Sequence, residues 1–213
     1  MKKIGWYAII SGLLGLIGYG FIIAFLISRS ENNNAFILMN RLHDIACAFQ
    51  FLLLVPVVSG VHKLLKQTNY DSNQRILFIG IIAASATALC LLLIFPKLVS
   101  EIFYMIPQGI FGVWLIAFNW SNYKFISKGL RIFGIIVGIG LVVAGSFPIG
   151  FGIFVSMDAL RMPAAPIREF PQTSVNNILH ILFFIGSFTG VLTLPFWTIF
   201  FGKALLGKRK TIT

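Results

Sequence analysis

The basic residues of this chain alternate with long apolar runs in a pattern typical of multi-pass membrane proteins. The apolar runs cover residues 6–28, 43–62, 76–96, 102–119, 130–147 and 178–202. Each is close to the ~20 residues that an α-helix needs to cross ~30 Å of hydrocarbon. We therefore predict an all-α fold, a polytopic integral membrane protein built as a bundle of six transmembrane helices.

The sidedness of the bundle follows from where the positive charges fall. Five of the 17 basic residues (Arg29, Arg41, Lys97, Arg161 and Arg168) share one side with five of the 6 acidic residues. The other side holds Lys2, Lys3, Lys63, Lys66, Arg75, Lys124, Lys128, Arg131, Lys203, Lys208, Arg209 and Lys210. The positive-inside rule then predicts that the N and C termini are both cytoplasmic. The formal net charge of +11 reflects this topology and attraction to anionic lipid, so we expect no nucleic-acid partner.

Composition supports a single membrane domain over residues 1–213. The chain is 58% hydrophobic and only 11% charged, which leaves too few polar residues to cover a soluble globule of this length. The first apolar run is about twice as long as a signal-peptide core and lacks a small-x-small cleavage site, so we expect it to remain as a span. The expected location is a prokaryotic cytoplasmic (inner) membrane, with membrane lipids as partners.

The fifth apolar run continues well past the length that a bilayer requires. Pro148, Gly150 and Gly152 interrupt it, and proline cannot donate to the helical hydrogen-bond ladder. We predict that this helix ends or kinks near residue 147, and that the outer segment 148–177 lies at the interface or forms a lid. A continuous, merely kinked helix is the alternative.

Glycines are spaced so that they mark helix contacts. They occur at Gly12, Gly15 and Gly18 in the first span, as Gly134-x-x-x-Gly138 in the fifth and as Gly186-x-x-x-Gly190 in the sixth. Small residues let helix backbones approach closely in lipid. These faces are expected to pack within the monomer, or alternatively to form a homo-oligomer. Cys47 and Cys90 are expected to be small apolar residues within spans, with a disulfide as the alternative.

Polar residues gather in the outer half of the predicted bundle. They come from three spans that enter from the same side: His43, Asp44 and Gln50, then Glu101, Tyr104 and Gln108, then His180. Such groups are costly in lipid unless they face the bundle interior, water or a ligand, which makes them candidate ligand-binding residues. The alternatives are interface residues for the shallow groups and interhelical hydrogen bonds for the two glutamines. We predict that Gln50, Gln108 and at least one of the two histidines face a common interior space.

The same residues give little support to metal or cofactor chemistry. Histidine and carboxylate groups at one depth could hold a divalent ion, and two histidines could hold a haem. However, no His-x-x-x-His or His-Glu-x-x-His pair occurs, and none of the serines lies in a nucleophile motif. We therefore expect no metal and no cofactor.

Two stretches carry a resemblance to a known family. Phe111-Gly-Val-Trp-Leu-Ile-Ala-Phe is followed by Lys128-Gly-Leu-Arg-Ile-Phe-Gly-Ile-Ile-Val-Gly-Ile-Gly140, and the chain closes with Phe196-Trp-Thr-Ile-Phe-Phe-Gly-Lys-Ala-Leu-Leu206. This pattern resembles a large bacterial and archaeal family of six-span membrane proteins of unknown function, best over the last half of the chain. The resemblance implies the six-span topology and no particular chemistry.

Three functions fit these observations. The leading hypothesis is a membrane protein that binds, or helps to translocate, a small apolar or lipid-like molecule through an outward-opening intramembrane cavity. The first alternative is an intramembrane enzyme acting on a lipid or isoprenoid, with His43, Asp44, Glu101 and His180 as acid, base or metal ligands. The second alternative is a structural subunit of a membrane complex.

Overall fold

The computed structural model describes residues 2–28, 33–67, 74–120, 126–160 and 173–207. These residues form seven α-helices and two short helical segments. Their bounds are α1 Lys2–Ser28, α2 Asn33–Gln67, α3 Gln74–Ile94, α4 Met105–Trp120, α5 Lys128–Phe154, the 3-10 helix η1 Met157–Leu160, α6 Ser174–Gly186, the π-helix η2 Ser187–Val191, and α7 Leu194–Gly207. No β-strand occurs in these ranges, which confirms the all-α prediction.

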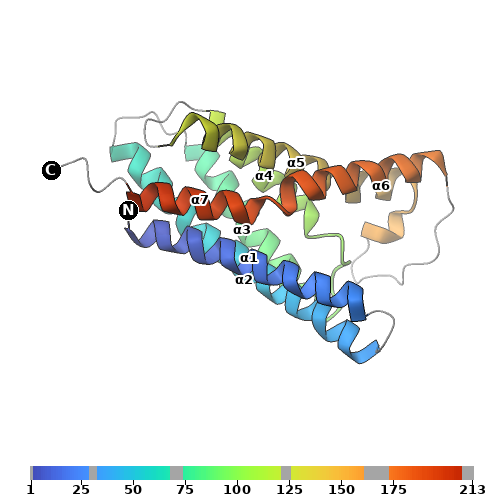
Figure 1. The fold of residues 1–213 in the computed structure, drawn as a ribbon. Coiled ribbons are helices and arrows are strands. Elements are labelled where there is room, and N and C mark those ends of the chain that lie inside the picture. Colours follow the sequence, from blue (N-terminus) through green and yellow to red (C-terminus); the bar gives the residue numbers. More distant parts are fainter. Residues whose placement is uncertain (1, 29–32, 68–73, 121–125, 161–172, 208–213) are drawn as a thin grey trace.

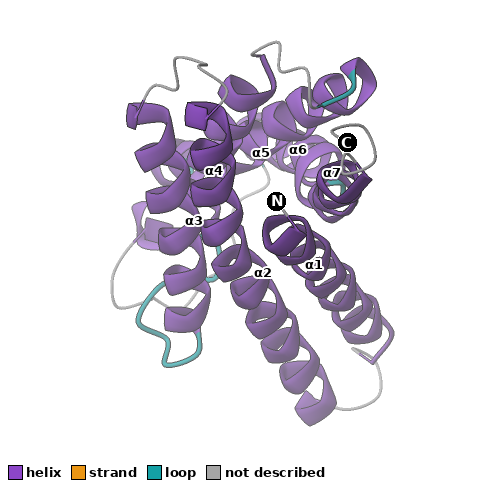
Figure 2. Ribbon diagram, turned by 90° about the vertical axis from the view of Figure 1, so that its left-hand side faces the viewer, coloured by secondary structure: helices purple, strands orange, loops and turns teal. Residues whose placement is uncertain are grey.

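Consecutive helices pack side by side around the bundle. α1 contacts α2, α2 contacts α3, α3 contacts α4 and α4 contacts α5, while α1 also packs against α7. α5 contacts α6, η2 and α7, which closes the arrangement (Figures 1 and 2). The start of α1 and the end of α7 lie at the same end of the bundle (Figure 1). A chain that crosses a membrane an even number of times must begin and end on the same side, as observed here. Which side of the membrane this end faces stays a prediction.

Aromatic rings from different helices fill the centre. Phe51 of α2 meets Phe111 of α4 edge-on, with 5.7 Å between ring centroids. Along α4, Trp114 stacks on Phe118 at 5.4 Å. Phe118 in turn meets Phe201 of α7 at 5.7 Å. Such pairs add stability beyond their buried area, and they tie α2, α4 and α7 together near the middle of the bundle.

The outer surface of the bundle is apolar. Large hydrophobic side chains face outward on every long helix, for example Ile82 at 63% exposure and Phe184 at 69%. Five helical stretches are long and apolar enough to cross a membrane: Lys2–Ala24, Ile37–Lys66, Arg75–Ile94, Lys128–Phe154 and Ser174–Gly207; α4 is shorter, at 16 residues. An exterior of this kind is not compatible with water on all sides. The fold is therefore consistent with a helical membrane bundle.

Two predicted helix ends are wrong. α2 begins at Asn33 rather than at residue 43, and the helix end predicted near residue 147 does not occur, because α5 continues through Pro148 to Phe154, as the alternative of a continuous helix predicted. Hydrophobicity marks where a helix enters lipid, and the backbone hydrogen bonds of α2 continue beyond that point. Pro148 is tolerated because neighbouring helices can shield the freed carbonyl of a membrane helix.

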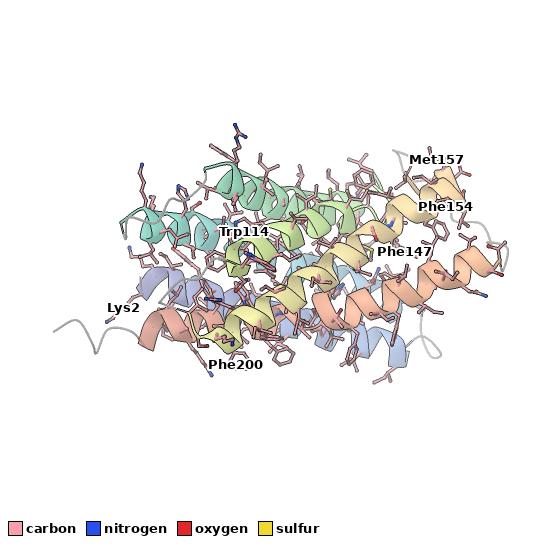
Figure 3. The ribbon with its side chains drawn as sticks, turned by 90° about the horizontal axis from the view of Figure 1, so that it is seen from above. Lys2, Trp114, Phe147, Phe154, Met157 and Phe200 are labelled. Atoms are coloured by element: carbon pink, nitrogen blue, oxygen red, sulfur yellow. The ribbon has the colours of Figure 1, made fainter. Side chains whose placement is uncertain are left out.

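The surroundings of the last turns of α5 explain their glycines. A Cβ on Gly150 would lie 2.9 Å from Leu179 of α6, and one on Gly152 would lie 2.4 Å from Leu160 of η1. The two glycines thus make room for side chains that cover the end of α5 (Figure 3, near Phe154 and Met157). Of the predicted lid, residues 161–172 lie outside the described residues.

The sixth predicted span is also corrected. Instead of one helix over residues 178–202, the chain forms α6, the π-helix η2 and α7, which follow one another along one line (Figure 1). The glycines at this break touch the backbone of α5, since a Cβ on Gly190 would lie 2.3 Å from the Leu141 nitrogen. Likewise a Cβ on Gly138 would lie 2.8 Å from the Gly112 oxygen. The glycine faces named by the sequence are thus used for packing within the chain.

Candidate functional site

α2 and α1 meet at a histidine in the half of the bundle away from the chain ends. His43 Nδ1 lies 3.0 Å from the backbone oxygen of Gly18. A carbonyl only accepts, so Nδ1 carries the proton and Nε2 is left as an acceptor in the neutral ring. The Sγ of Cys47 lies 3.7 Å from Nε2. A Cβ on Gly18 would sit 3.2 Å from Cys47 Sγ and 3.4 Å from His43 Nδ1, so this glycine makes the close approach possible.

α4 and the residues before it bring further polar groups to the same place. Tyr104 lies close enough to Cys47, Asp44 and Glu101 for a charge on any of these side chains to act on its hydroxyl group. The hydroxyl group of Tyr19 on α1 is close enough to Cys47 and Tyr104 for the same kind of interaction. We call these six residues the outer cluster: Tyr19, His43, Asp44, Cys47, Glu101 and Tyr104. The structure thus brings together four of the predicted site residues: His43, Asp44, Glu101 and Tyr104.

Gln108 lies one turn further along α4 than Tyr104. Its side chain is 3% exposed, and its buried Oε1 atom has no hydrogen-bond partner among the residues that the structure describes. The same helix face carries Phe111, which contacts Phe51 of α2. Tyr104 and Phe111 flank Gln108 on this face, so the amide lies between the outer cluster and the aromatic centre. A buried amide oxygen without a donor is costly, so this position favours a hydrogen-bond donor from a bound molecule or water.

Gln50 faces a different neighbour. Its side chain is 3% exposed, and a Cβ on Gly15 would lie 2.7 Å from Gln50 Oε1 and 2.5 Å from Pro195 Cγ. The amide of Gln50 thus lies where α1, α2 and α7 meet. One turn away, Ser11 Oγ donates to the Gln50 backbone oxygen at 3.0 Å. These contacts anchor α2 to α1 beside the broken helix.

His180 does not join the outer cluster. It projects from α6 onto α5, with 5.5 Å between its ring centroid and that of Phe147 and 6.4 Å to that of Phe151. The four groups proposed for an intramembrane enzyme therefore do not meet as one set. Among the described residues, no three His, Cys, Asp or Glu side chains form a group that could hold a metal ion. Arg161 and Arg168, which were assigned to the outer side from the charge pattern, lie outside the described residues.

Tyr19 and Cys47 are the two members of the outer cluster that were not among the predicted site residues, and Tyr19 makes a contact of its own. Its hydroxyl donates to the backbone oxygen of Val191, the last residue of η2. In a continuous helix this oxygen would accept from the N–H four residues on, but that residue is Pro195, which has none. A tyrosine from α1 thus supplies the missing donor. The sequence shows a possible donor, Tyr19, in one span and a proline that frees a carbonyl, Pro195, in another. It does not show that the two lie together.

Threonines satisfy the other carbonyls at the break. Thr193 Oγ1 donates to the Thr189 oxygen, and lies 3.4 Å from that of Gly190. Thr189 Oγ1 donates to the Ile185 oxygen at 2.7 Å. The Leu192 N–H reaches back to the Ser187 oxygen at 2.9 Å, which is the spacing of a π-helix. Short π segments inside α-helices are frequent at functional sites.

Both cysteines are free. Both lie half-buried, Cys47 beside His43 on α2 and Cys90 on α3. The disulfide considered from the sequence does not form.

No family model, curated protein or solved structure matches this chain.

Proposed function

We propose that this protein, in a prokaryotic cytoplasmic membrane, binds or helps to translocate a small or lipid-like molecule at the outer cluster and Gln108. The observation that carries the proposal is the buried Gln108 oxygen without a partner. A molecule that fits must offer a hydrogen-bond donor, such as a hydroxyl or an ammonium group, because an amide oxygen only accepts.

The break in the sixth span supports the same proposal. Discontinuous membrane helices recur at the substrate sites of transporters, where irregular backbone lines the site. Here the break at Val191 is bonded to Tyr19, which is itself a member of the outer cluster. The polar groups and the irregular backbone thus belong to one neighbourhood shared by α1, α2, α4 and η2.

The test replaces Gln108 by leucine, which keeps the volume and removes the acceptor. The protein is purified in mild detergent, and retained small molecules and lipids are extracted and identified by mass spectrometry. We expect the Gln108→Leu variant to retain about tenfold less of the molecule, since a buried hydrogen bond contributes roughly 1–3 kcal/mol. Removing an unsatisfied buried acceptor does not by itself destabilise a fold, so the loss is expected without a lower unfolding temperature.

The matched control is Thr87→Val. Thr87 is also fully buried, but its hydroxyl donates within its own helix to the Ala83 oxygen at 2.8 Å. We expect this variant to retain the molecule as the unchanged protein does. If Gln108→Leu retains just as much, or if it is more stable and the unchanged protein carries no specific molecule, Gln108 is only an imperfectly paired core residue.

A further inference from the structure

A pocket of about 370 Å³ lies between α5 and α7, and it belongs to neither the outer cluster nor the helix break. Its lining consists of Ser127, Gly129, Leu130, Phe133, Phe200 and Ala204. This volume is within the range of small-molecule sites in proteins. The pocket lies toward the chain-end side of the bundle, in the half where Figure 3 shows Lys2 and Phe200, away from Phe154 and Met157.

The lining changes from polar to apolar along the helices. At the start of α5, the Oγ of Ser127 accepts from the Leu130 N–H at 3.3 Å, so its own hydroxyl hydrogen can be donated elsewhere. Among the described residues, a Cβ at Gly129 would meet no atom within 4 Å. Deeper in, the rings of Phe133 and Phe200 lie 6.4 Å apart and form an apolar wall. A headgroup fits the first part and an acyl chain the second.

Two exposed lysines are sequence neighbours of lining residues. Lys128 is next to Ser127 at the start of α5, and Lys203 is next to Ala204 on α7; both are exposed. No acidic residue occurs in the stretches 126–134 or 194–207 that hold the lining. Basic pockets between membrane helices bind anionic lipid headgroups, and each lysine near the surface adds about 1 kcal/mol of attraction.

The geometry points to a specific site for one anionic phospholipid in this pocket. Its phosphate lies between Lys128 and Lys203 and accepts from Ser127, and an acyl chain lies along Phe133 and Phe200. The inference does not depend on the proposed function, because it uses a different face of the bundle and none of the residues of the outer cluster.

The test is native mass spectrometry of the purified full chain, titrated in detergent with dioleoylphosphatidylglycerol or with dioleoylphosphatidylcholine. We expect the anionic lipid to bind more tightly than phosphatidylcholine. Each of Lys128→Gln and Lys203→Gln, which together form the pocket pair, should weaken this binding roughly fivefold. The matched control is Lys63→Gln with Lys66→Gln, which removes the same charge from α2. Gly129→Leu, which fills the pocket and keeps every charge, should also weaken binding.

Each outcome decides the inference. If the control pair weakens binding as much as the pocket pair, the attraction is only the diffuse charge of this end of the bundle. If Gly129→Leu has no effect, or if both lipids bind equally, the pocket does not hold the lipid. Loss of anionic lipid in the pocket pair and in Gly129→Leu, with the control pair unaffected, supports the site.

Discussion

The bond from Tyr19 to the Val191 carbonyl can be tested with a double-mutant cycle. Because Pro195 lacks an N–H, Tyr19→Phe leaves a partly buried carbonyl without its donor. Interhelical hydrogen bonds in membrane proteins contribute about 0.6 kcal/mol on average and up to about 1.7. We expect Tyr19→Phe to lower the free energy of unfolding by about 1 kcal/mol, because no water replaces the lost donor.

Pro195→Ala restores an N–H at the position that normally bonds the Val191 carbonyl. In the Pro195→Ala protein, Tyr19→Phe should lower the free energy of unfolding by less than about 0.5 kcal/mol, which is the size of deviation that independent mutations usually show. Pro195 also packs beside Gly15, and the cycle cancels that separate cost. The assay is reversible unfolding in mixed micelles, with Tyr7→Phe on an exposed face of α1 as the control. An equal cost of Tyr19→Phe in both backgrounds would refute the argument that the tyrosine replaces the missing backbone donor.

Three further predictions concern packing, backbone and topology. Gly145→Ala places a Cβ 2.5 Å from the α4 backbone and should cost about 1–3 kcal/mol of unfolding free energy, whereas Gly129→Ala on the same helix meets nothing within 4 Å and should not destabilise. Lys97 has φ 58°, so Lys97→Gly should raise stability by about 1 kcal/mol in the same unfolding assay. After removal of both native cysteines, Lys66→Cys and Glu101→Cys should react with an impermeant maleimide from opposite membrane faces; labelling from the same face would overturn the six-span topology.

The helices were predictable because hydrophobic length is imposed by the bilayer itself. Each of the six apolar runs lies largely within described helices, from α1 to α7. Their ends were less predictable, since a helix stops where its backbone loses partners and not where lipid stops. α2 begins at Asn33, before its apolar run begins, whereas α3 ends at Ile94, before its apolar run ends. At the end of α3 the Lys97 N–H donates to the Ile94 oxygen and the Leu98 N–H donates to the Leu93 oxygen, which forms a cap with Lys97 in the left-handed region.

Proline alone did not decide where a helix breaks. Pro148 lies inside α5 without ending it, whereas the break in the sixth span lies four residues before Pro195, at the carbonyl that this proline leaves without an N–H donor. The difference lies in the neighbours. α6 and η1 cover the end of α5, whereas at Val191 a tyrosine hydroxyl reaches the freed carbonyl. Because those neighbours come from distant parts of the chain, a local sequence pattern cannot distinguish the two cases.

The candidate site shows the same limit at the level of single side chains. His43 and Tyr104 were predicted to enter the bundle from the same side, and in the structure both belong to the outer cluster. Spacing within one helix says nothing about rotation relative to another, so His180 could not be separated from them; it packs on the rings of α5 instead. Tyr19 and Val191 are 172 residues apart. A sequence shows which polar groups a membrane segment contains, and only the fold shows which of them, like the Gln108 oxygen, have no hydrogen-bond partner among the described residues.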